Sequence, residues 1–161
     1  MDSENLAPEP QKFGGWLILV GIGVVVTPFS FLISLVPLYR TLFQEGAWQL
    51  LASPSSDFYN PLLSSILVGE MVINACLLLA SVMILVKFFA KSRLFPKLYI
   101  AMAILTLCFI VADAAAVKMV VPEEPMFDEQ TVKELVRSLV VVLIWCPYML
   151  ISERVKATFT L

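Results

Sequence analysis

The amino-acid sequence predicts an all-α membrane protein, a bundle of four transmembrane helices with a short interfacial helix in its first outer loop. The first observation is composition: the 161 residues are 60% hydrophobic and 15% charged, whereas soluble domains are about 45–50% apolar and about 25% charged. The second is a set of four apolar runs, each close to the ~20 residues that cross a ~30 Å hydrocarbon core. The third is that these runs lack the strict alternation of membrane strands.

The four expected spans belong to one domain. We expect residues 14–161 to form a single four-helix transmembrane domain, and the polar, acidic segment 1–13 to be a disordered cytoplasmic tail. The spans are placed at about residues 15–38, 62–86, 98–121 and 131–151. In the first span, Pro28 and Pro37 are expected to kink or end the helix, and Thr27 is placed to bond a carbonyl that a proline leaves free.

Loop charges predict the orientation of the chain. Residues 87–97 carry four basic residues and no acid, whereas residues 122–130 carry four acids and no base. The positive-inside rule places the basic loop in the cytoplasm. Because the number of spans is even, both termini are then cytoplasmic, and loops 39–60 and 122–130 face outward.

The first outer loop, residues 39–60, contains a further helical signal. Its apolar residues follow one helical face, which places Trp48 at the level of the lipid headgroups. The Ser-Pro-Ser-Ser sequence at residues 53–56 then ends the helix. We therefore expect a short interfacial helix with Trp48 as a candidate lipid contact.

Charged residues inside the spans are the candidate functional residues. A charge in the middle of a membrane costs at least ~2.5–3.5 kcal/mol, so it normally faces protein or water and has a partner. Glu70 and Asp113 each lie nine residues from the proline that bounds their span, at a depth of about 13 Å, and Arg137 lies about 9 Å deep. Glu70 and Asn74 share a helix face. These four residues are predicted to form one buried polar network.

The predicted network has two interpretations. As a structural staple, Arg137 neutralises Asp113, Glu70 or both, and determines which helices are neighbours. As a functional site, two carboxylates against one guanidinium leave a surplus negative charge that holds a shared proton or a cation. We favour the staple, because ion pairs within membranes are often only structural.

Composition and motifs argue against catalytic chemistry. The chain has no histidine, the commonest metal ligand and general base, and it has no nucleophile elbow, phosphate-binding loop or zinc-protease motif. Cys76, Cys108 and Cys146 each lie in an apolar run, which is typical of buried, unpaired thiols. We expect no enzymatic activity, no cofactor and no metal site. The net charge of −2 argues against nucleic-acid binding.

Two stretches resemble a known family. The first is Gly14-Gly15-Trp16-Leu17, and the second is the pattern Trp145-x-x-Tyr148-x-x-x-Ser152-x-Arg154-Val155-x-x-Thr158-Phe159. Together with four spans and a long first outer loop, they resemble domain-of-unknown-function family 2569, small proteins of the bacterial inner membrane. The resemblance implies a multi-pass protein in that membrane. It implies no established activity and therefore no catalytic residues.

The C-terminal stretch also has a physical interpretation. Arg154 and Lys156 follow the fourth span, where each can bind an anionic lipid headgroup for about 1 kcal/mol. Phe159 and Leu161 are expected to return to the membrane interface. The segment is either a topology anchor, which we favour, or a docking tail for a cytoplasmic or membrane partner.

These observations predict a small membrane protein without catalytic activity. It would be a component or accessory subunit that interacts with membrane lipids and with another membrane protein or a second copy of itself. The alternative is a small proton-coupled permease that uses Glu70, Asn74, Asp113 and Arg137. The two functions differ in whether this cluster is sealed or opens to a water-filled pocket.

Overall fold

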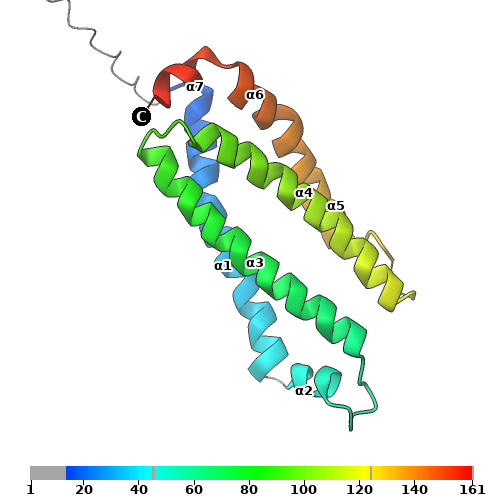
Figure 1. Cartoon of the computed structure of the whole chain (residues 1–161). Coiled ribbons are helices and arrows are strands. Elements are labelled where there is room, and N and C mark those ends of the chain that lie inside the picture. The colour runs from blue at the N-terminus through cyan, green and yellow to red at the C-terminus, as the bar shows by residue number, and fades with distance from the viewer. Residues whose placement is uncertain (1–13, 45, 124, 161) are drawn as a thin grey trace, which may run out of the picture.

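The computed structural model describes residues 14–44, 46–123 and 125–160, and its regular structure is helical (Figure 1). The predicted tail, residues 1–13, and Leu161 lie outside the described residues. Four stretches of 29, 29, 26 and 23 residues are long and apolar enough to cross a membrane. At 1.5 Å per residue they are about 35–44 Å long, which exceeds a hydrocarbon core of about 30 Å. The predicted fold class is confirmed.

Helix α1, Trp16–Gln44, is longer than the sequence predicted. Pro28 and Pro37 both lie inside it, so the expected end near residue 38 is wrong. The Thr27 hydroxyl, next to Pro28, donates a hydrogen bond of 2.7 Å to the carbonyl of Gly23. Proline removes the donor for the carbonyl four residues earlier, which for Pro28 is that of Val24. The expected bond from Thr27 to a carbonyl freed by proline is therefore wrong, because the carbonyl that it bonds is that of Gly23.

A short helix, α2, covers Ala47–Ala52 in the loop where one was predicted. Helix α3, Pro61–Phe89, follows, and its first turn is capped by Asn60, whose side chain accepts a hydrogen bond of 3.0 Å from the backbone of Leu63. Proline at the first helical position suits this start, since its missing donor has no partner there in any helix. Helix α4 then covers Phe95–Val120.

The fourth span is one continuous helical stretch in three parts. Helix α5 covers Glu129–Val140, a π-helical turn covers Val141–Trp145, and helix α6 covers Cys146–Ile151. The wide turn precedes Pro147, which has no backbone donor for the carbonyl one turn earlier. In the wide turn, the backbone of Cys146 bonds the carbonyl of Val141. A last short helix, α7, covers Glu153–Thr158.

The helices pack in chain order, with α3 against α1 and α4, and with α4 against the whole of the last span. Helices α2 and α7 lie at opposite ends of the molecule, here called the α2 end and the α7 end (Figure 1). The buried apolar cluster lies at the α7 end and consists of Leu17, Val20, Val24, Ile84, Phe88, Phe95, Met149, Val155 and Phe159.

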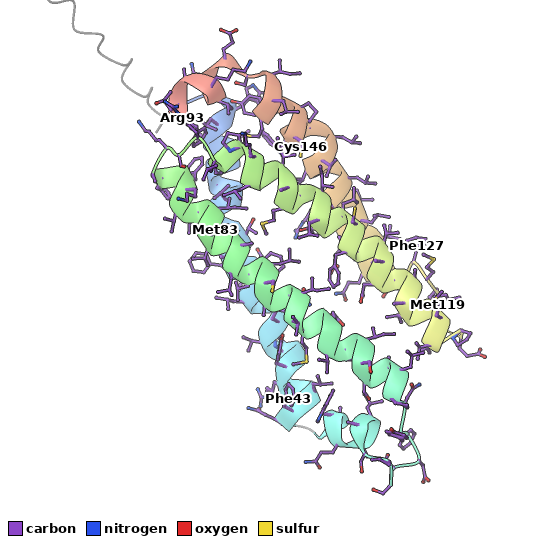
Figure 2. The ribbon with its side chains drawn as sticks, in the orientation of Figure 1. Phe43, Met83, Arg93, Met119, Phe127 and Cys146 are labelled. Atoms are coloured by element: carbon purple, nitrogen blue, oxygen red, sulfur yellow. The ribbon has the colours of Figure 1, made fainter. Side chains whose placement is uncertain are left out.

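The rest of the bundle is more open to its surroundings. Towards the α2 end, the buried residues include small side chains such as Ser64, Ala114 and Ser138, which permit close helix approach. Apolar side chains are exposed over the bundle surface, among them Phe43, Met83 and Met119 (Figure 2). An apolar surface of this kind is expected for helices that contact lipid rather than water.

Candidate functional site

Two of the predicted carboxylates lie on neighbouring helices towards the α2 end. Glu70 on α3 and Asp113 on α4 are both half-buried, and the negative charge of Asp113 acts on Glu70. Asn74, one turn further along α3, donates a hydrogen bond of 3.5 Å from Nδ2 to Oε1 of Glu70. The shared helix face read from the sequence thus identified the pair of Glu70 and Asn74, which are joined by a hydrogen bond.

A third carboxylate, Glu134 on α5, acts electrostatically on both Glu70 and Asp113. Sequence reasoning missed this residue because it lies in the amphipathic start of the last span. A signal was present, since Gln130 and Glu134 are four residues apart and therefore share a helix face. In the structure, Gln130 Nε2 donates a hydrogen bond of 3.2 Å to Glu134 Oε1.

Arg137 does not join this group. Its side chain is exposed, and within residues 14–44, 46–123 and 125–160 it makes no ion pair or hydrogen bond with Glu70 or Asp113. Its neighbour Ser138 is the residue that α5 buries. Consecutive helical residues point about 100° apart, so burial of Ser138 turns Arg137 towards the flank of the helix. The geometry therefore does not support the predicted ionic staple.

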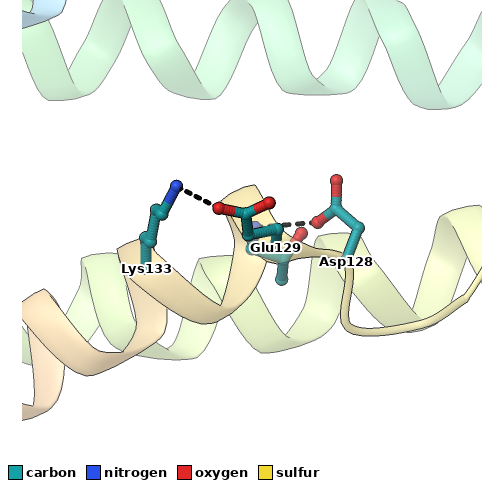
Figure 3. Close-up of polar contacts among 4 residues, drawn as sticks. Asp128, Glu129 and Lys133 are labelled. Atoms are coloured by element: carbon teal, nitrogen blue, oxygen red, sulfur yellow. Dashed lines mark hydrogen bonds and ion pairs between the residues drawn. The ribbon is translucent and has the colours of Figure 1, made fainter.

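The start of α5 is held by exposed polar contacts (Figure 3). The Asp128 carboxylate accepts a hydrogen bond of 2.8 Å from the backbone of Thr131, and Lys133 forms an ion pair of 2.6 Å with Glu129. The hydrogen bonds from Thr131 hold the pKa of Asp128 below its ordinary value of 3.8. These contacts stabilise the first turns of α5, which place Glu134 and Arg137.

The described residues offer little for catalysis or metal binding. In that part of the chain no group of three histidine, cysteine, aspartate or glutamate residues could hold a metal ion. The three cysteines are free thiols, and only Cys146 is buried, so the expected burial of Cys76 and Cys108 is wrong. What the arrangement offers chemically is three carboxylates, those of Glu70, Asp113 and Glu134, whose negative charges act on one another.

Trp48, the candidate interfacial residue, lies on α2. Its side chain is half-buried, and its ring centroid is 6.0 Å from that of Phe43 near the end of α1. Phe43 also stacks on Tyr39, at 6.3 Å between centroids. This row of rings holds α2 against the end of α1, the position expected for a helix at a membrane interface.

Arg154 and Lys156, the other candidate lipid contacts, are both exposed on α7. The side of α7 that faces the bundle is apolar and buried, with Val155 and Phe159 at 1% and 4% exposure. The segment is therefore packed against the core through this side, and docking of a partner on its exposed basic side stays a prediction. The expected return of Phe159 to the membrane interface is wrong, because its ring stacks on Phe95 at 4.5 Å between centroids.

The two stretches that suggested a family meet at the α7 end. The rings of Trp16 and Trp145 are 6.2 Å apart. The guanidinium of Arg154 lies against Gly14, where a Cβ atom would collide with it, and Gly15 has a left-handed φ of 59° that favours glycine. Arg93, in the loop between α3 and α4, donates from Nε to the carbonyl of Thr160.

Both of these stretches lie within the part of the chain that matches a known family. The family described as "Protein of unknown function (DUF2569)" matches residues 10–160. The chain belongs to this family. The predicted resemblance is confirmed. Of the residues that carried it in this DUF2569 protein, Trp16 and Trp145 join α1 to the last span, and Phe159 packs against α4. No curated protein and no solved structure shows significant similarity to the chain.

Proposed function

We propose that this protein is a non-enzymatic membrane component that assembles with another membrane protein through α5. The observation that carries the proposal is Arg137. It lies eight residues after Glu129, the first residue of α5, which is about 12 Å along the last span. Its charge is exposed and makes no ion pair among the described residues, and an unpaired charge at that depth is unfavourable in lipid.

Arg137 belongs to a larger exposed feature, the polar stripe of α5. The stripe consists of Gln130, Lys133, Glu134 and Arg137, all of them exposed. Their positions span about 100° of the helix circumference. A polar face on a membrane-spanning helix is normally turned towards protein or water rather than lipid. A partner helix with acidic or amide side chains would satisfy it.

We place the protein in the inner membrane of a bacterium, with both termini in the cytoplasm. The basic loop 87–97 and the acidic loop 122–130 support this orientation. The four helices that are long and apolar enough to cross a membrane support a multi-pass membrane protein. Lipids contact the apolar surface, and the exposed Arg154 and Lys156 supply cationic groups for lipid headgroups on the cytoplasmic side.

The proposal is tested by photocrosslinking in cells. A photoreactive amino acid replaces Lys133 in the polar stripe or, as a matched control, Leu105, an exposed residue of α4. We expect a discrete protein adduct from position 133 and only lipid adducts from position 105. Arg137→Gln should weaken the adduct. Equal adducts at both positions, or an adduct that Arg137→Gln leaves unchanged, would contradict assembly through α5.

A small proton-coupled permease is the second candidate. The observation that favours it is the half-burial of Glu70 and Asp113, which leaves neither carboxylate sealed. Glu70→Gln keeps the side-chain shape and removes its proton exchange. For a membrane component we expect Glu70→Gln to fold and to show no transport defect in reconstituted vesicles. A folded mutant that abolishes a wild-type proton flux would favour the permease.

A further inference from the structure

A groove of about 480 Å³ lies between α1 and α3, towards the α2 end. Ligand pockets in proteins have volumes of about 300–1,000 Å³. Its walls are aliphatic over most of its length, with Leu32, Leu35 and Val36 from α1 and Leu78 from α3. One end is polar, because Tyr39, Arg40 and Gln44 line it. The groove therefore separates an apolar part from a cationic part.

The polar end is organised by Tyr39 and Arg40. The Tyr39 hydroxyl donates a hydrogen bond of 3.2 Å to the carbonyl of Met71, so the ring is held across the groove against α3. Arg40, the next residue, is exposed and makes no hydrogen bond or ion pair within the part of the chain that the structure describes. Its guanidinium is free to bind an anion that enters the groove.

The length of the groove matches one leaflet of a membrane. Leu32 and Gln44 are twelve residues apart on α1, a rise of about 18 Å. Half of a hydrocarbon core is about 15 Å, so the aliphatic walls lie at the depth of acyl chains and Arg40 lies near the headgroups. A second groove, beside Gly21 and Phe88, has only apolar residues and offers no group that could bind a headgroup.

We propose that the groove between α1 and α3 binds one phospholipid, with its phosphate on Arg40 and an acyl chain along Leu32, Leu35 and Val36. Guanidinium groups bind phosphate with two parallel hydrogen bonds, which makes arginine suited to this role. The groove lies on α1 and α3, whereas the polar stripe lies on α5. The test of lipid binding and the test of assembly through α5 can therefore fail independently of each other.

The test measures the dissociation constant of the first bound lipid by native mass spectrometry of the purified protein. The probes are palmitoyl-oleoyl phosphatidylglycerol and a diacylglycerol with the same chains. We expect phosphatidylglycerol to bind and Arg40→Gln to weaken it about tenfold or more, because a hydrogen bond to a charged group contributes at least that factor. Leu35→Trp, which fills the groove, should weaken binding with the charge intact.

Lys97→Gln is the matched control, since Lys97 is an exposed basic residue at the α7 end. It removes one positive charge and should leave the affinity unchanged. The diacylglycerol, which lacks the phosphate, should bind at least about tenfold more weakly. Unchanged affinity in Arg40→Gln, equal weakening by Lys97→Gln, or equal binding of the diacylglycerol would overturn the proposal.

Discussion

Thr158 is completely buried, and its hydroxyl has no hydrogen-bond partner among the residues that the structure describes. It belongs to the stretch shared with the family, beside Val155 and Phe159 in the apolar cluster. A buried donor without a partner costs about 1–3 kcal/mol, because it loses its hydrogen bonds to water and gains none. At the residue scale, this position is destabilising for the fold.

We expect Thr158→Val to raise the free energy of unfolding by about 1–2 kcal/mol, since valine has nearly the same shape and no hydroxyl. Unfolding by denaturant in detergent micelles measures the change. Thr27→Val is the matched control, because the Thr27 hydroxyl bonds the carbonyl of Gly23 and its loss should bring no gain. Destabilisation by Thr158→Val would show that the hydroxyl has a partner.

Gly21 is a second residue whose size matters. A Cβ atom at this position would lie 2.8 Å from Cζ of Phe88, a ring with only 3% exposure. We expect Gly21→Ala to destabilise the protein by about 1–3 kcal/mol through overpacking. Gly23, two residues away, has no atom within 4 Å of such a Cβ, so Gly23→Ala should leave stability unchanged or raised. Equal effects in unfolding assays would contradict this packing.

At the scale of elements, local chemistry decides where each helix begins, and side chains decide whether it continues. Asn60 and Asp128 cap the starts of α3 and α5. Proline has opposite effects in two places: α1 continues through Pro28 and Pro37, whereas the turn before Pro147 widens into a π-helix. In a membrane-spanning helix a lost donor is compensated locally, so proline alone does not predict an end.

The cap of α5 predicts a pH dependence. The pKa of Asp128 is lower in the folded protein than in the unfolded chain, where it is 3.8. The stabilisation of α5 by the Asp128 carboxylate is therefore fully present at pH values above 3.8, and it is lost as the pH falls through the pKa of the folded state. We expect the Thr131 amide resonance to be constant from neutral pH to about 4–5 and to shift below that. Asp128→Asn caps equally well and does not titrate, so its profile should be flat.

At the scale of the whole molecule, orientation follows from charge. We expect a green fluorescent protein fused after Leu161 to fluoresce, because that reporter folds only in the cytoplasm. Alkaline phosphatase fused after Asp57, in the outer loop, should be active, and the same enzyme fused after Arg93 should be inactive. Fluorescence of a green fluorescent protein fused after Asp57, together with active phosphatase fused after Arg93, would show that the topology is the reverse of the one predicted.

The candidate site was predictable only in part. The pairing of Glu70 with Asn74 follows from helical spacing, and the approach of Asp113 follows from its equal depth. Depth does not specify the direction in which a side chain leaves its helix, and for this reason Arg137 was wrongly joined to the group and Glu134 was missed. The direction depends on which face of α5 packs against α4, and Ser138 occupies that face.

The number of spans, their approximate positions and the short helix at Ala47–Ala52 follow from the sequence alone, because hydrophobic length and capping are properties of consecutive residues. The tertiary structure decided the role of the C-terminal segment, which looked like an exposed basic tail and is packed as α7 against Phe88 and Phe95. Burial of Phe159 depends on side chains more than sixty residues away in the chain. Such contacts exist only once the helices have come together.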